Sequence, residues 1–115
     1  MILHMRPHKH PPASDFVLER VLYALSDSIR LDIVRRLAGV AAATCGELDG
    51  GRPKSTVSHH FKVLRESGLV FTENSGTIHM NSLRRLDIDA RFPGLLDAIL
   101  AQHPVSVFAA AAASN

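Results

Sequence analysis

The stretch KSTVSHHFKVLRESGLV, residues 54–70, decides the fold. Pro53 stands directly before it and cannot lie inside a helix, so a helix is expected to begin at or just after this residue. Gly68 is typical of a residue that ends a helix, which predicts a helix running to about Ser67. The apolar residues that recur at helical spacing, and so form its expected buried side, are Val57, Phe61 and Leu64.

A β-hairpin is expected directly after this helix. Residues 69–71 (LVF) begin a strand, residues 74–77 (NSGT) have the composition of a tight turn, and Ile78–Leu83 returns as a second strand. The pattern therefore predicts a helix that leads straight into a two-stranded wing.

Two amphipathic helices are expected upstream. Ser14 and Asp15 can cap the first of them. Ser26 can cap the second, with Asp27 in its first turn and Gly39 at its end. The apolar positions are Phe16, Val17, Val21, Leu22 and Leu25 in the first helix and Ile29, Ile33, Val34 and Leu37 in the second.

A short third helix is expected near residues 42–48, although Thr44, Cys45 and Gly46 are poor helix formers. The sequence DGGRP at residues 49–53 is the strongest turn signal in the chain. A short helix, a turn that contains glycine and a longer helix together make a helix-turn-helix.

A last helix is expected near the C-terminus, with Pro93 as its first residue and His103 and Pro104 at its end. Its apolar face consists of Leu95, Leu96, Ile99 and Leu100. The predicted fold class is mainly α with a two-stranded β-wing, a winged helix-turn-helix in the order α-α-α-α-β-β-α.

The length of 115 residues and the hydrophobic fraction of 46% fit one packed domain. We expect a mobile N-terminal arm at residues 1–14, a winged helix-turn-helix domain with dimerising terminal helices at residues 15–103, and an Ala-rich tail at residues 104–115. The sequence has neither a signal-peptide pattern nor the roughly 20 apolar residues of a membrane span. The single cysteine, Cys45, excludes an intramolecular disulfide, and a cytoplasmic protein is expected.

Positive charge is concentrated in one part of the chain. Residues 50–65 carry Arg52, Lys54, Lys62 and Arg65 without an acidic residue, a charge of +4 in a chain whose net charge is +2. Such a concentration is expected of a surface that faces phosphates, although a solvated helix face would show it too.

The exposed face of the helix at 54–67 carries hydroxyl, imidazole and ammonium groups, which suit base edges and phosphates in DNA. The expected DNA-binding residues are Lys54, Ser55, Thr56, Ser58, His59, Lys62 and Arg65, and the expected wing residues are Asn74, Ser75, Thr77 and His79. His60 faces the buried side and is expected to help seat the helix. The wing lacks the Arg or Lys that normally enters a minor groove. Arg84 and Arg85 either contact phosphates or pair with Asp87 and Asp89.

Two segments, LSDSIRLDIVRRLA (25–38) and STVSHHFKVLRESGLV (55–70), closely resemble the ArsR/SmtB family of bacterial winged-helix repressors. The resemblance covers roughly residues 16–102. It implies a homodimer, joined largely through the first and last helices, that binds an imperfect palindrome in a promoter. It also implies repression that is relieved when a metal ion or an oxidant acts on the dimer.

The amphipathic helices at both ends of the chain independently support a dimer, although their apolar residues could also belong to the core of a single chain. The residues expected at the dimer interface are Phe16, Val17, Leu95, Leu96 and Ile99.

The residues that the resemblance implies for metal sensing are missing. The family's thiolate site uses a pair of cysteines on the third helix, where this chain has only Cys45, and a zinc site needs about four ligands. The family's other site uses Asp and His on the last helix, where this chain offers Asp87, Asp89 and His103 without a nearby second His. We therefore expect no metal and no cofactor.

The alternative is a metal- or redox-responsive repressor with a rearranged sensing site. Its candidate residues are His4, His8, His10, Cys45, Asp89 and His103. A third hypothesis, a winged-helix interaction module without a DNA function, is disfavoured by the acid-free stretch at 50–65. An enzyme is not expected, because His59, His60 and Cys45 have no plausible nucleophile, base and acid arrangement and no phosphate-cradling glycine loop occurs.

Overall fold

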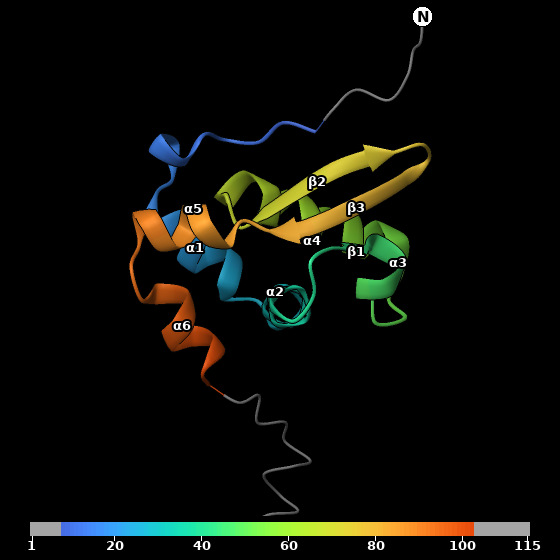
Figure 1. The fold of residues 1–115 in the computed structure, drawn as a ribbon. Helices are drawn as coiled ribbons and strands as arrows, with labels where there is room; N and C mark the ends of the chain where they lie inside the picture. Colours follow the sequence, from blue (N-terminus) through green and yellow to red (C-terminus); the bar gives the residue numbers. More distant parts are fainter. Residues whose placement is uncertain (1–7, 103–115) are drawn as a thin grey trace, which may run out of the picture.

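The computed structural model describes residues 8–102, and the expected C-terminal tail, His4 and His103 lie outside these residues. Six α-helices, one 3₁₀ turn and three strands are found in this part of the chain (Figure 1). In chain order they are η1 (Ala13–Asp15), α1 (Leu18–Leu25), α2 (Ser28–Ala38), β1 (Ala43–Thr44), α3 (Cys45–Leu48), α4 (Lys54–Ser67), β2 (Val70–Ser75), β3 (Ile78–Leu83), α5 (Arg85–Arg91) and α6 (Leu95–Leu100).

The winged helix-turn-helix fold is confirmed. Helices α3 and α4 form the helix-turn-helix, and β2 and β3 pair antiparallel from Val70 opposite Leu83 to Ser75 opposite Ile78. The short strand β1 adds a third, antiparallel strand along β3, so the sheet order is β1-β3-β2. The sequence analysis missed β1 because two residues are too few to show an alternating pattern.

The core lies where α1, α2 and α4 pack together and against β2 and β3. Phe61, Ile33, Leu37 and Leu64 are among its largest fully buried side chains. Figure 1 shows α1, α5 and α6 at one end of the molecule and the hairpin tip with α3 at the other. No helix in the described range 8–102 is long and apolar enough to span a bilayer.

The first helix begins later than expected. Residues 13–15 form a 3₁₀ turn, and α1 starts at Leu18 after the extended residue Val17, without a side-chain cap. The expected cap by Ser14 and Asp15 is therefore wrong. Phe16 is buried outside the helix, because the chain turns to place its ring beside Gly68 at the end of α4.

The cap of the second helix is Asp27 rather than Ser26. The Asp27 carboxylate accepts hydrogen bonds from the backbone N–H groups of Ile29, at 2.8 Å, and Arg30, at 3.0 Å. Ser26 instead ends α1, and its hydroxyl donates to the carbonyl of Tyr23 at 2.6 Å. A carboxylate accepts stronger hydrogen bonds from the free N–H groups at a helix start than a hydroxyl does. Ser26 is also unavailable as a cap for α2, because it ends α1.

The C-terminal part differs most from the prediction. The expected single helix is two helices, α5 and α6, separated by a turn at residues 92–94. Pro93 is not the first residue of α6, since Gly94, with a φ of 81°, is its N-cap. The sequence analysis missed helix α5 because its sequence, RLDIDAR, is mostly charged. Leu86 and Ile88 are its large apolar residues and only Ile88 is buried, so no helical apolar period can be recognised.

Candidate nucleic-acid interface

Helix α4 is held by the turn before it and the stop after it. Gly50 and Gly51 have φ values of 62° and 80°, which lets the chain reverse sharply ahead of Pro53. Pro53 precedes the helix without any side-chain cap among the described residues, so the first backbone N–H groups of α4 face outward. Gly68, with a φ of 93°, ends the helix as predicted.

The two faces of α4 divide as the periodicity predicts. Val57, Phe61 and Leu64 are buried in the core, and His60 is buried beside them. The solvent side is continuous with the helix start and carries six exposed candidate residues and one half-buried one. The exposed residues are Lys54, Ser55, Thr56, Ser58, His59 and Lys62, and the half-buried residue is Arg65.

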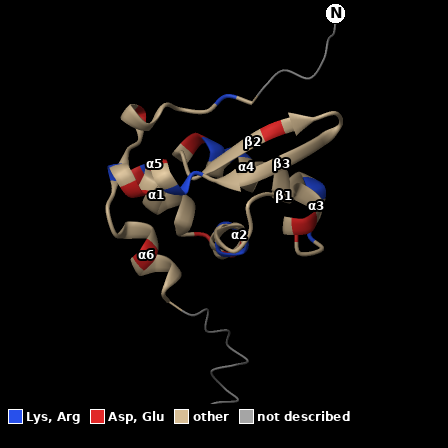
Figure 2. Cartoon of the chain, in the orientation of Figure 1, with Lys and Arg blue, Asp and Glu red and all other residues tan. Residues whose placement is uncertain are grey.

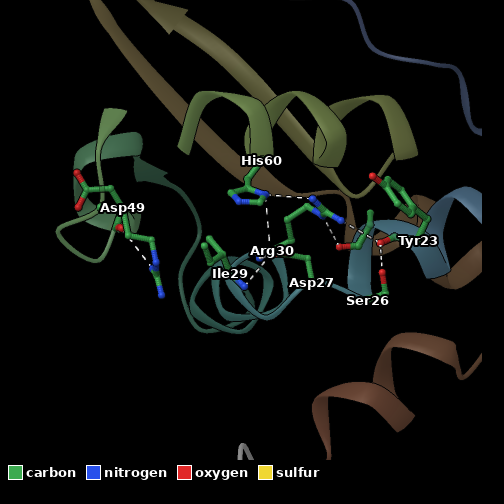
Figure 3. A network of polar contacts seen from close by, with 9 residues as sticks. Tyr23, Ser26, Asp27, Ile29, Arg30, Asp49 and His60 are labelled. Atoms are coloured by element: carbon green, nitrogen blue, oxygen red, sulfur yellow. Dashed lines mark hydrogen bonds and ion pairs between the residues drawn. The ribbon is translucent and has the colours of Figure 1, made fainter. Parts of the chain in front are cut away.

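A buried polar network seats α4 on α2. The Arg30 side chain, only 4% exposed, donates from Nη1 to Nδ1 of His60 at 3.0 Å (Figure 3). It also donates from Nε to the Ala24 carbonyl at 2.8 Å and from Nη2 to the Tyr23 carbonyl at 3.2 Å. These carbonyls belong to the C-terminal turn of α1, so one guanidinium joins α1, α2 and α4.

The charge state of His60 follows from this network. Burial lowers the pKa of His60, and Arg30 adds to the lowering, while the Asp27 carboxylate, 3.8 Å from Nδ1, opposes it. Nδ1 accepts a hydrogen bond only in the neutral imidazole, because Arg30 cannot act as an acceptor. His60 is therefore a structural residue, and the geometry leaves His59 alone on the exposed face.

The wing residues lie at the end of the hairpin farthest from α1. Ser75 and Thr77 are exposed, while Asn74 and His79 are half-buried. The turn has a φ of 64° at Gly76, and nothing lies within 4 Å of the Cβ position there. Its residues are uncharged, and Figure 2 shows the hairpin tip without a cation.

A groove of about 520 Å³ separates the wing from α3 and the start of α4. It is lined by Ser58 and Arg65 from α4, Thr77 and His79 from the wing, Cys45 from α3, and His8 from the N-terminal segment. The groove thus brings candidate residues of the helix and of the wing to one concave surface.

Residues 8–12, which we name the N-terminal segment, lie against the wing, whereas a mobile arm was expected there. The backbone N–H of Thr72 donates to Nε2 of His10 at 2.9 Å, and the His10 ring stacks on Phe71 with centroids 4.3 Å apart. Residues 8–12 of the expected arm therefore contact the winged helix-turn-helix domain. Sequence reasoning missed this contact because it joins positions 62 residues apart.

Arg84 and Arg85 pair with acidic side chains. Nη2 of Arg84 lies 2.9 Å from Asp87, and Nε of Arg85 lies 2.9 Å from Asp89. Arg85 also pairs with Asp97. These pairs favour the ion-pair interpretation over phosphate contacts for both residues.

Two of the expected dimer residues belong to the core of the single chain. Phe16 is 2% exposed and Leu96 is fully buried, because each packs against helices of its own protomer. Val17 is 42% exposed, and Leu95 and Ile99 are half-buried. Leu18 and Leu22 on α1 and Leu86 on α5 are also exposed, and the sequence analysis did not place them at the expected dimer interface.

Between residues 8 and 102 no group of three or more His, Cys, Asp or Glu side chains could hold a metal ion, and His4 and His103 of the rearranged site lie outside this range. Cys45 is half-buried, and its sulfur accepts a hydrogen bond from Nδ2 of Asn81 at 3.3 Å. Asn81 is fully buried and also donates to the Ala43 carbonyl while accepting from Thr72, so Cys45 lies at the end of a network that ties α3 to the sheet.

Known proteins with similar sequences and folds are regulators of transcription. Residues 25–72 match the family described as "Helix-turn-helix domain". An uncharacterized HTH-type transcriptional regulator of Bacillus subtilis (strain 168), YceK, is 34% identical over 90 residues, which are 76% of this chain and 90% of that protein.

Two solved structures have the same fold. The crystal structure of an ArsR family transcriptional regulator covers 70% of this chain and 90% of its own, with a TM-score of 0.60 and 23% identity. The crystal structure of the transcriptional repressor BigR from Xylella fastidiosa covers 65% of this chain and 85% of its own, with a TM-score of 0.53 and 28% identity. The chain therefore belongs to the helix-turn-helix transcriptional regulators, and it has the winged-helix fold seen in the ArsR family structure.

Proposed function

We propose that the chain is a sequence-specific DNA-binding repressor that acts as a homodimer on a palindromic promoter site, without the usual metal sites of its family. The proposal rests on the two faces of α4, one of which is buried in the core while the other exposes hydroxyl, imidazole and ammonium groups. Such a helix fits the major groove, where Ser and His can read base edges and Lys can reach guanine or phosphate. Promoter DNA also implies a cytoplasmic site of action.

The relatives support regulation rather than catalysis. YceK and the ArsR family protein are described as transcriptional regulators and BigR as a repressor. We infer from this that the protein is a repressor and not an enzyme. No residue from 8 to 102 is assigned to a metal or cofactor in this proposal.

The homodimer is supported by apolar surface that the single chain leaves uncovered. Val17, Leu18 and Leu22 are 42%, 40% and 45% exposed, and Leu86 is 84% exposed. An amphipathic helix end that keeps this much apolar surface in water is typical of an interface. In a two-fold dimer the two α4 helices would read half-sites about 34–36 Å apart.

Selection of bound fragments from the source genome tests the proposal and yields the operator. With the selected fragment, Lys62→Ala and Ser58→Ala are expected to weaken binding by about 1–3 kcal/mol if they read bases. Arg91→Ala on α5 removes an equal charge outside the interface and serves as the control. If no genomic fragment is retained, or if both α4 variants bind like wild type, the proposed function is wrong.

A further inference from the structure

The wing has no positive charge of its own. Residues 74–77 at its tip are uncharged, and the only charged residue of strands β2 and β3 is the acidic Glu73. Winged proteins normally bring Arg or Lys to the DNA at this place. The wing of this chain therefore needs another source of cations if it lies against phosphates.

The N-terminal segment lies along the outer strand of the wing. His10 is held there by the hydrogen bond from Thr72 and by stacking on Phe71, and the ring of His8 meets the ring of His79 edge-on at 4.9 Å. Nη1 of Arg84 donates to the Pro11 carbonyl at 2.7 Å and fixes the other end of the segment. Four contacts, made by His8, His10 and Pro11, therefore define the position of the segment.

His8 and His10 hold the N-terminal segment in place as uncharged side chains. Burial lowers the pKa of His8, with Arg65 and His79 adding to the lowering, while burial and then Arg84 lower the pKa of His10. Both rings are therefore neutral at neutral pH, and His10 must be neutral at Nε2 to accept from Thr72. Lys9, between them, is exposed and carries the charge of the segment.

Arg65 is a half-buried cation without a carboxylate partner. Its side chain lines the groove beside His8 and makes neither an ion pair nor a hydrogen bond with residues 8–102, although the nearby Glu66 acts to raise its pKa against the lowering by burial. By contrast, Arg30, Arg36, Arg84 and Arg85 all have partners. The groove also contains Arg52 and Lys54 against the single acid Asp49, so its charge suits an anion.

We propose that the N-terminal segment is a third DNA-contacting element beside α4 and the wing, and that Lys9 on this segment and Arg65 in the groove bind backbone phosphates of the operator. The inference rests on the proposed function and extends it to Lys9, which lies outside both the helix-turn-helix and the wing. The segment supplies the wing with the cation that its own turn lacks, and His8 and His10 hold the segment against the wing.

The test measures affinity for the selected operator fragment against salt concentration. Lys9→Gln and Arg65→Gln are each expected to reduce the slope of log affinity against log salt by about 1, and to weaken binding by about three- to tenfold at moderate salt. Both should weaken binding to matched and mismatched fragments equally, because phosphates carry no sequence information. Arg91→Gln is the charge-matched control and keeps the wild-type slope.

A double-mutant cycle tests the anchor. His10→Ala is expected to weaken binding as much as Lys9→Gln, and the double variant no more than either one, because Lys9 acts only while His10 holds the segment. Additive effects would overturn the anchoring role. Thermal unfolding of each variant shows that the domain remains folded.

The outcomes separate this inference from the proposed function. If Lys62→Ala weakens binding while Lys9→Gln and Arg65→Gln bind with the wild-type slope, the inference is wrong and the proposed function stands. If wild type retains no DNA fragment, both are wrong.

Discussion

Nη1 of Arg30 lies 3.0 Å from Nδ1 of His60, and both side chains are buried. The two residues are thirty positions apart, one on α2 and one on the buried side of α4 (Figure 3). Their contact sets how α4 sits on the body of the domain. Burying a guanidinium costs free energy even when three acceptors surround it, so this arrangement is expected only where its geometry fixes the position of the helix.

Removal of Arg30 is expected to destabilise the fold more than any exposed arginine does. Arg30→Met keeps much of the apolar stem but leaves His60 and the carbonyls of Tyr23 and Ala24 without their donor. The free energy of unfolding is expected to fall by about 2–4 kcal/mol, the cost of several buried unsatisfied groups. Urea denaturation measures it, with Arg36→Met as the control, since Arg36 is exposed and pairs only with Asp32. Equal effects of the two variants would contradict the network.

Acid is expected to destabilise the domain through His60. Its pKa is lowered in the folded state, chiefly by burial and then by Arg30, against the opposing effect of Asp27. As the pH falls through about 6.5, the usual pKa of histidine, the unfolded chain takes up a proton that the folded chain refuses. The free energy of unfolding therefore decreases as the pH is lowered. This decrease levels off once the pH is below the pKa of His60 in the folded state.

His60→Asn is expected to remove part of that pH dependence, since the amide can accept from Arg30 but does not titrate. The part that remains belongs to His8 and His10, whose pKa values are lowered in the same direction. Urea denaturation at several pH values between about 5.5 and 8 measures how the free energy of unfolding changes with pH. His59→Asn is the control at the neighbouring exposed residue, and it should change the slope less than His60→Asn does. An unchanged slope in His60→Asn would show that His60 is already free to titrate.

Gly68 is expected to tolerate no side chain. A Cβ at this position would lie 2.3 Å from Cε1 of the buried Phe16, and the φ of 93° is unfavourable for any other residue. Gly68→Ala should therefore cost well above the about 1 kcal/mol of conformational strain alone. Gly76→Ala is the matched control, because its φ of 64° brings the same kind of strain with open space around the Cβ. Thermal unfolding of both variants would refute the packing argument if their melting temperatures fell equally.

The proposed dimer predicts a charge-sensitive apolar surface on α1. Leu22 is 45% exposed, so Leu22→Glu should leave the single chain folded while placing a charge in the interface. Analytical ultracentrifugation is expected to give a dimer for wild type and a monomer for Leu22→Glu, with weaker operator binding. Val40→Glu, at a residue that is 50% exposed beyond α2, should remain dimeric. A wild-type monomer at the concentrations that bind operator would disprove the dimer.

The prediction from sequence succeeded where one local signal was sufficient. Pro53 and Gly68 mark the two ends of α4, because each restricts or frees the backbone at its own position. Strand β3 has the expected bounds, Ile78–Leu83. It failed where two local signals compete. Ser26 and Asp27 are both good caps, and only the packing of α1 against α2 shows that the carboxylate starts the second helix.

The candidate interface shows the same division. Helical periodicity separated the exposed Ser58, His59 and Lys62 from the buried His60. The wing residues, however, gave no hint that the N-terminal segment covers their outer strand, because a hydrogen bond between His10 and Thr72 has no signature in either local sequence.

The amino-acid sequence by itself therefore determined the helix at residues 54–67, the hairpin after it and the division of that helix into two faces. These follow from backbone restriction at Pro and Gly and from the period of the apolar residues, and both act over a few positions. Only the tertiary structure decided that Arg30 seats His60, that Phe16 closes against Gly68, and that residues 8–12 join the wing. Such contacts depend on which distant surfaces meet after folding, and burial then selects the partners that satisfy each polar group.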